Sequence, residues 1–195
     1  MIHPDTELRY VNERLGLGVF ATRDIPRGTI TWVQDALDQV FSPAEVQNLA
    51  EPYQHILRKY AYTNRQGQIV LCWDHARFVN HACEAVCLMS GFGFEIATRD
   101  LHAGEELTDD YGLLNLRNAF SCACGSPTCR KWLQPQDFVR CGDRWDDLLR
   151  GSVQQIPTVP QPLWWLLDQA DEVLAASRDP SRLPTCQSLR ATRPA

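Results

Sequence analysis

Three cysteines fall within eight residues of this chain, at Cys122, Cys124 and Cys129. Structural zinc is bound by four ligands in a tetrahedral arrangement and favours sulfur. The cluster therefore predicts a zinc site whose fourth ligand comes from a distant part of the chain. Buried free thiols, or a disulfide between two of the three, are the alternative. A metal would help to fold this segment, which is too short for a core of its own.

The composition is that of an ordinary globular protein with one domain and an appendage. The chain has 195 residues, 44% of them hydrophobic and 22% charged. A net charge of -5 argues against direct nucleic-acid binding and would mildly attract a basic partner. The sequence shows no leader peptide and no run of 18 apolar residues, so no membrane association is expected. We expect an intracellular, soluble protein, cytoplasmic or, in a eukaryotic host, nuclear, in which cysteines serve better as metal ligands than as disulfides.

A second polar stretch, Arg77 to Cys83, packs a cation, an aromatic ring, an amide, an imidazole and a thiol into seven residues. Alone, its Asn-His pair is typical of a turn. Gly16-Leu17-Gly18 is also turn-like, and it lacks the remainder of a dinucleotide-binding fingerprint. Two closely spaced glycines nevertheless let the backbone approach a ligand. The segment Gly104 to Gly112, which ends in Asp-Tyr-Gly, completes four local patterns in a fixed order.

Taken together, the four patterns resemble the SET-domain protein-lysine methyltransferases that carry a cysteine-bearing post-SET segment. The resemblance covers roughly residues 10 to 134. It implies a mainly β fold with short helices (α+β), a knot-like active site and a zinc-bearing post-SET segment, to which a C-terminal helical extension is added. It also implies S-adenosylmethionine as methyl donor and a protein or peptide that presents a lysine as substrate. The oligomeric state is left open.

The resemblance also implies residue roles. Tyr111 would be the catalytic residue, with a hydroxyl that orients the substrate amine beside the transferred methyl group. Cys83 would be the fourth zinc ligand, joining Cys122, Cys124 and Cys129. Tyr60 or Tyr62 would reach the cofactor or the substrate channel. The implied contacts to S-adenosylmethionine are Gly16, Leu17, Gly18, Arg77, Phe78, Asn80, His81, Tyr111, Phe120 and Leu133.

Several positions depart from the family pattern. Ala82, Ala85 and Val86 stand where the family often has serine, proline and asparagine, and Lys131 stands where glycine is common. Asp109 replaces an aromatic residue that limits the number of methyl groups transferred, which leaves the methylation state open. Asp109 and Ala82 sustain an alternative function, a non-catalytic SET-like zinc module that binds peptide or cofactor without turnover. Glu105 and Glu106 are expected to be solvated or structural.

Local patterns predict the secondary structure and the boundaries. Residues 19–22 and 29–33 read as a strand hairpin, and residues 69–73 and 92–98 as further strands. An echo of residues 21–28 in residues 97–104 indicates two similar β-units in one domain. Other predicted elements are a capped helix after Ser42, an inward-packed helix at 52–60 bearing Tyr53 and Ile56, a short helix at 143–151 and a helix from residue 162. The predicted boundaries are a catalytic domain at 1–120, a zinc segment at 121–134, a helical extension at 135–177 and a disordered tail at 178–195.

Overall fold

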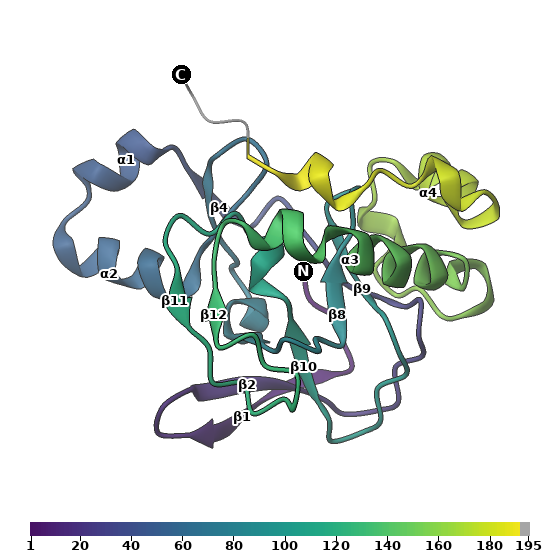
Figure 1. Ribbon diagram of the computed structural model, residues 1–195, viewed down its shortest axis with the longest axis horizontal. Helices are drawn as coiled ribbons and strands as arrows, with labels where there is room; N and C mark the ends of the chain where they lie inside the picture. The colour runs from purple at the N-terminus through teal and green to yellow at the C-terminus, as the bar shows by residue number, and fades with distance from the viewer. Residues whose placement is uncertain (192–195) are drawn as a thin grey trace.

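Seven strands form the main sheet of the computed structural model, which describes residues 1–191 (Figure 1). Six of them follow the order β1-β2-β10-β8-β9-β3, and β7 pairs with β10. The strands of this sheet are β1 (Thr6–Asn12), β2 (Gly16–Ala21), β3 (Ile30–Val33), β7 (Asn80–His81), β8 (Cys87–Met89), β9 (Phe94–Ala97) and β10 (Glu106–Asp109). Two smaller sheets contain β4 (Gln39–Phe41), β5 (Tyr62–Thr63) and β6 (Ile69–Leu71), and β11 (Phe120–Ser121) and β12 (Trp132–Leu133). The predicted mainly β architecture is confirmed.

The predicted hairpin of residues 19–22 and 29–33 is wrong, although both strands form. β2 pairs with β1 on one side and with β10 on the other, so neither of its edges is free for β3. β3 pairs instead with β9. β1 is not predicted from the sequence, and this strand takes the place that the hairpin partner was expected to fill.

The two echoed segments bind each other. The Gly28 N–H donates to the Ala97 carbonyl at 2.9 Å, and the Gly104 N–H donates to the Ala21 carbonyl at 2.7 Å. Both glycines have φ of +89°, a left-handed conformation that other residues adopt only at a cost. The echo therefore marks two similar turns, here called the paired turns, that hold opposite parts of the main sheet together.

Two helices between β4 and β5 lie on one side of the molecule (Figure 1). α1 (Pro43–Asn48) begins with the predicted capping box, in which the Ser42 hydroxyl accepts from the Glu45 N–H and the Glu45 carboxylate accepts from the Ser42 N–H. α2 (Glu51–Tyr60) follows, and only its Leu57 is buried. The prediction that Tyr53 and Ile56 face inward is wrong, because both side chains are exposed.

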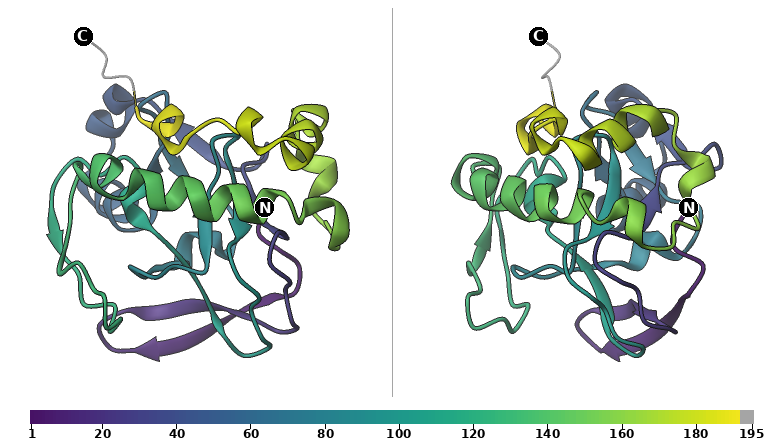
Figure 2. Two further views of the ribbon diagram at one scale, coloured as in Figure 1. Left: turned by 45° about the vertical axis from the view of Figure 1, so that its right-hand side comes forward. Right: turned by 90° about the vertical axis from the view of Figure 1, so that its right-hand side faces the viewer.

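The C-terminal helices lie on the other side, as the rotated views also show (Figure 2). α3 (Asp137–Val153) is 17 residues long, about twice the predicted length, and packs on β9. The predicted helix from residue 162 is interrupted, because Leu167 is extended between a short 3-10 helix and α4 (Ala170–Arg178). No helix in residues 1–191 is both long and apolar enough to cross a bilayer. The 3-10 helices are η1 (His75–Phe78), η2 (Tyr111–Leu113), η3 (Ile156–Thr158), η4 (Trp164–Leu166), η5 (Pro180–Arg182) and η6 (Cys186–Leu189).

Residues 178–191, where a disordered tail is predicted, are packed against the domain. Cys186 is fully buried, and its N–H donates to the Asp146 carboxylate on α3 at 2.7 Å. The Gln187 side chain donates to the Phe138 carbonyl at 2.7 Å. The prediction of disorder is therefore wrong up to residue 191, and residues 192–195 lie outside the described residues.

Asn115 fastens this C-terminal segment to β5. Its amide nitrogen donates to the carbonyls of Thr63 at 3.0 Å and Leu189 at 2.9 Å, and its amide oxygen accepts from the Ala191 N–H at 2.7 Å. Asn115 has φ of +54°, which asparagine tolerates better than most residues. One side chain thus joins three separate segments.

We expect Asn115→Gly to lower the free energy of unfolding by about 2 kcal/mol. Glycine adopts the left-handed backbone without strain, so the lost stability comes from the three side-chain hydrogen bonds. Each of them contributes roughly 1 kcal/mol or less. Urea denaturation measures the change. Asn118→Gly, at an exposed position in the same segment, is the matched control, and equal losses in the two variants would contradict the role of Asn115.

Candidate functional site

Parallel pairing of β7 with β10 brings the polar stretch Arg77–Cys83 against Tyr111. Asn80 is opposite Thr108 and His81 is opposite Asp109, and η2 begins at Tyr111 immediately after β10. The Tyr111 hydroxyl donates to the Val79 carbonyl at 2.7 Å, and its ring lies 5.4 Å from the His81 ring. Burial raises the pKa of the Tyr111 phenol, with a contribution from Asp109. The phenol is therefore neutral and held in a fixed direction.

Asn80 connects this stretch to the glycine pair. Its side-chain amide donates to the Leu17 carbonyl at 3.1 Å and to the Glu106 carboxylate at 2.8 Å. A Cβ on Gly18 would come within 2.4 Å of that carboxylate, so the contact requires glycine here. Gly16 has φ of +77° and open space where a Cβ would be. Glu106 thus has a structural contact, in line with one of its two expected roles.

A cavity of about 690 Å³, here called the Tyr111 cavity, opens between α1, α2 and the main sheet. Tyr60 and Tyr62 both line it, so the choice between them that the sequence left open does not arise. Among the predicted cofactor contacts, Arg77, Tyr111 and Phe120 also line it. The others lie outside this lining: Gly16, Leu17, Gly18, Phe78, Asn80, His81 and Leu133.

The inner wall of the Tyr111 cavity is acidic. Glu95 on β9 and Asp109 on β10 both line it, and Asp109 is 1% exposed. Burial, followed by the charge of Glu95, raises the pKa of the Asp109 carboxyl well above its usual range. Burial likewise raises the pKa of Glu95, to about 7. Glu95 was not predicted as a site residue from the sequence. A single acid in the otherwise apolar strand Phe94–Ala97 could have indicated it.

Sulfur and nitrogen donors converge beside His81. One ligand atom each from His81, Cys83, Cys122 and Cys124 lies within 4.8 Å of the other three. The Cys83 and Cys122 sulfurs are 3.8 Å apart, which matches the edge of a tetrahedron with metal–sulfur bonds of about 2.3 Å. The fourth predicted ligand, Cys129, is adjacent, with its thiol directed at the Cys122 carbonyl at 3.7 Å. The donor set fits a zinc ion.

Lys131 adopts a left-handed backbone in the turn that carries these thiols. Its φ is +64°, and its N–H donates to the Cys129 sulfur at 3.4 Å. Its carbonyl accepts from the Cys122 N–H at 2.7 Å. A lysine here is strained by about 1 kcal/mol relative to glycine. Lys131, which stands where the family commonly has glycine, therefore keeps the geometry of the turn at a cost in conformational free energy.

An ion pair joins the cysteine segment to the tyrosine and to α3. Arg130, which follows Cys129, binds the Asp110 carboxylate, whose side chain is 2% exposed, and contacts Asp137 at 3.5 Å. Asp110 also accepts from the Trp145 indole N–H at 3.0 Å. None of these contacts follows from local sequence spacing, because the partners come from three segments. This set of residues is called the Asp110 junction below.

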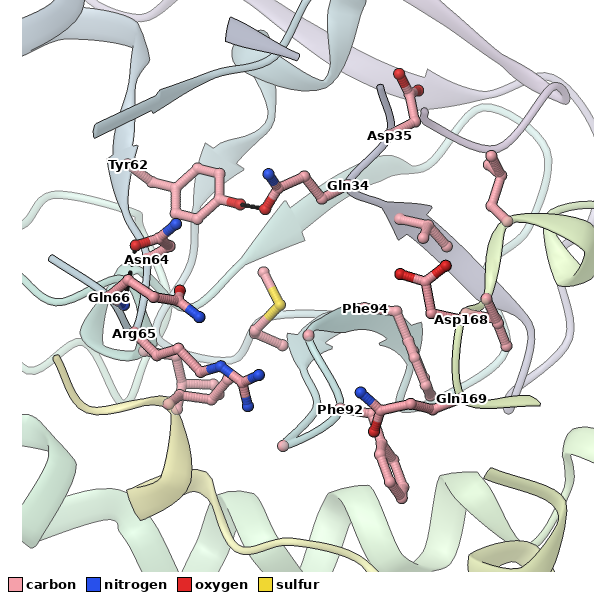
Figure 3. Close-up of a pocket in the computed structure, with 18 of the residues that line it drawn as sticks. Gln34, Asp35, Tyr62, Asn64, Arg65, Gln66, Phe92, Phe94, Asp168 and Gln169 are labelled. Carbon is pink, nitrogen blue, oxygen red and sulfur yellow. Dashed lines mark hydrogen bonds between the residues drawn. The ribbon is translucent and has the colours of Figure 1, made fainter. Parts of the chain in front are cut away.

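A second cavity, of about 660 Å³, lies between the strand ends and the C-terminal segment (Figure 3). Polar and apolar side chains line it in about equal measure, and the polar ones include Gln34, Asn64, Arg65 and Gln169. The Tyr62 hydroxyl donates to the Gln34 amide oxygen at 3.3 Å. This Gln34 cavity shares Tyr62 with the Tyr111 cavity but contains none of the predicted catalytic, cofactor or metal residues.

Residues 16–112 match the SET domain family, so this part of the chain belongs to that family. The predicted family and its fold are therefore confirmed. The post-SET cysteine segment lies beyond the matched residues.

Several curated relatives are similar over part of their length. The chain is 30% identical over 132 residues to the histone-lysine N-methyltransferase trr of Drosophila melanogaster, an alignment that covers 60% of this chain and 5% of that protein. It is 29% identical over 144 residues to an H3 lysine-36 specific histone-lysine N-methyltransferase of Mus musculus, covering 67% of this chain and 5% of the relative. It thus spans about a twentieth of the length of these relatives.

Among solved structures, the chain aligns with the methyltransferase domain of human histone-lysine N-methyltransferase SETMAR. The TM-score is 0.49 at 20% sequence identity, and the alignment covers 69% of this chain and 58% of that chain. Both curated relatives are named histone-lysine N-methyltransferases.

We expect Asp110→Asn to lower the free energy of unfolding by about 3 kcal/mol. Asparagine keeps the shape but leaves the buried Arg130 charge without its nearest counter-charge, and loss of one partner from a buried ion pair is costly. Urea denaturation measures the loss. Asp147→Asn on α3 is the control, because Asp147 is paired to Arg150 at the surface. If the two variants lose the same free energy, the Asp110 junction is not a stabilising contact.

Proposed function

We propose that the chain is an S-adenosylmethionine-dependent protein-lysine N-methyltransferase. The observation that carries the proposal is the position of Tyr111: within a SET domain, it lines a cavity, its hydroxyl donates to the Val79 carbonyl, and its backbone N–H donates to His81 Nδ1. Tyr111 is the proposed catalytic residue. Phosphate-loop and Ser-His-Asp patterns are not apparent in the sequence, which supports no second enzyme class.

S-adenosylmethionine is proposed to bind between the glycine pair and the Asn80-His81 strand. The hydrogen bond from Asn80 to the Leu17 carbonyl supports this, because it places the two segments side by side. The open space at Gly16 leaves its backbone accessible. When bound, the donor would supply a methyl group activated by a sulfonium charge. Arg77, Phe78, Phe120 and Leu133 remain proposed contacts around it.

The chain's part in the reaction would be alignment and exclusion of water. A lysine amine must lose its proton before it can attack, and its ordinary pKa of about 10.4 keeps it almost fully charged near neutral pH. Desolvation in the Tyr111 cavity and a nearby cationic donor would favour proton loss. The neutral Tyr111 hydroxyl would then hold the amine in line, and such positioning contributes substantially to rate.

Zinc bound by Cys83, Cys122, Cys124 and Cys129 is proposed to hold the post-SET segment over the site. The sulfur spacing supports it, and His81 is a further nearby donor. All eight cysteines are free in residues 1–191, which supports the reducing, intracellular setting included in this proposal. The proposed substrate is a lysine-bearing protein or peptide. Relatives are named for both lysine 4 and lysine 36 of H3, so their names favour no single target.

We expect Tyr111→Phe to reduce methyl transfer at least about a hundredfold, because a positioned group at the reacting atoms typically contributes that much. Incorporation of labelled methyl from S-adenosylmethionine into histone H3 and into a lysine-rich cell extract measures it. Tyr10→Phe, at an exposed tyrosine on β1, is the matched control. Unchanged transfer in Tyr111→Phe would remove the catalytic assignment. Absence of transfer by the wild type to either substrate would favour the alternative of a non-catalytic binding module.

We expect the purified protein to contain about one zinc ion per chain, and Cys122→Ser to lose most of it. Elemental analysis measures the metal content. Removal of zinc by a chelator should lower the melting temperature, since metal binding contributes folding free energy. Cys141→Ser, at a cysteine on α3 outside the thiol cluster, is the control and should retain zinc. Equal zinc content in the two variants would exclude the proposed ligand set.

A further inference from the structure

The inner wall of the Tyr111 cavity contains two carboxyl groups that the proposed function has not used. Glu95 comes from β9 and Asp109 from β10, and both line the cavity together with Tyr111. The two side chains interact directly, because the charge of Glu95 contributes to the raised pKa of Asp109. Two acids therefore face the space in which the substrate side chain would lie.

Asp109 is incompletely paired. Its Oδ1 accepts from the Asp110 N–H at 2.7 Å. Apart from a side-chain contact between Asp109 and the Glu95 carboxyl, its Oδ2 has no hydrogen-bond partner within the described residues, although Asp109 is 1% exposed. A buried carboxyl oxygen that no N–H donor reaches is costly, so it calls for an explanation, of which a bound ligand is one. Asp109 is among the residues that line a cavity large enough to admit a side chain, so the carboxyl lies directly behind the surface that a ligand with donor hydrogens would meet.

Four basic residues, Arg58, Lys59, Arg77 and Arg117, also line the cavity. Beside the two acids, the surroundings favour an organic cation over a metal ion. Trp32, Tyr62 and Met89 line the same region, and the rings of Trp32 and Tyr62 meet edge to face at 5.8 Å. Hard divalent ions require six or more oxygen ligands, which this wall lacks. Aromatic faces attract ammonium groups, and an ammonium group carries three N–H donors for carboxyl oxygens.

We propose that Glu95 and Asp109 form a cation-binding wall that receives the ammonium group of a lysine-type side chain in the Tyr111 cavity. The inference deepens the proposed function and rests on it for the identity of the amine. The wall selects the substrate by charge, and Tyr111 then aligns the same nitrogen. Glu95 and Asp109 are thus specificity-determining residues, and Asp109 stands where the resembling enzymes carry an aromatic side chain.

The electrostatics of the empty wall are consistent with this role. Burial raises the pKa of both carboxyl groups, and the charge of Glu95 raises the pKa of Asp109 further, so negative charge on this wall is disfavoured without a counter-charge. A bound ammonium group would offset that repulsion. An apolar side chain of the same length would leave the carboxyl groups unpaired, and a site with unpaired polar groups rejects such ligands strongly.

The test compares two small probes that differ in one group. Nα-acetyl-lysine methylamide carries the ammonium group, and Nα-acetyl-norleucine methylamide lacks it. Binding to the full chain is followed by NMR through the Trp32 indole N–H signal, because Trp32 lines the cavity. The variants are Asp109→Asn and Glu95→Gln, which keep the side-chain shape. Asp168→Asn, which removes a carboxylate from the Gln34 cavity instead, is the control.

In the wild type we expect the lysine probe to bind with a Kd about tenfold below that of the norleucine probe. This ratio should fall at least about fivefold in Asp109→Asn or Glu95→Gln and stay unchanged in Asp168→Asn. The inference is overturned if the ratio of the two Kd values is unchanged in both wall variants. It is also overturned if the wild type binds the two probes equally, or if its Trp32 signal does not respond to the lysine probe. Unaltered amide spectra establish that the variants are folded.

Methyl transfer by the same wild-type sample separates this inference from the proposed function. If the wild type transfers methyl groups but the wall variants leave the ratio of the two Kd values unchanged, the cation-binding wall is overturned and the proposed methyltransferase function stands. A charge-dependent ratio without transfer to any lysine supports the wall and counts against the enzyme.

Discussion

The contact between Arg130 and Asp110 is the one on which the rest of the site depends. Asp110 precedes Tyr111, and Arg130 follows Cys129, so one buried ion pair connects the tyrosine to the thiol cluster. Trp145 and Asp137 bring α3 to the same point. A helix that the sequence suggested was an appendage thus contributes directly to the position of the central tyrosine. Burial of these charges is tolerated only because each has several partners.

Asp109, at the wall of the Tyr111 cavity, is less completely paired than Asp110. Asp109 is as deeply buried as Asp110, yet one of its oxygens has no N–H donor among residues 1–191. Neighbouring positions at the end of one strand therefore carry an acid whose pairing fixes structure and an acid with incomplete pairing at the wall of a cavity. Structural strain of this kind is expected where a protein binds a ligand, because local stability is lost in return for recognition.

Features set by neighbouring residues were predictable, and features set by distant partners were not. The Ser42 capping box, the thiol spacing and the family match all depend on short stretches of sequence. The strand pairing of β2 depended instead on β1, whose residues give a weak alternation. The order of residues 178–191 depended on Cys186 reaching Asp146, 40 positions away. Within the site, Tyr111 was found by motif, whereas Glu95 and Arg130 became visible only when the chain was folded.

The paired turns have a consequence for the way this domain tolerates change. Because the amide of Gly28 is bound by the carbonyl of Ala97 and that of Gly104 by Ala21, neither loop has an independent shape. Lengthening one of them would displace the acceptor that the other needs. Insertions and loop exchanges are therefore compatible with the fold only when both turns are changed together. The junctions of a chimera should lie outside the two paired turns.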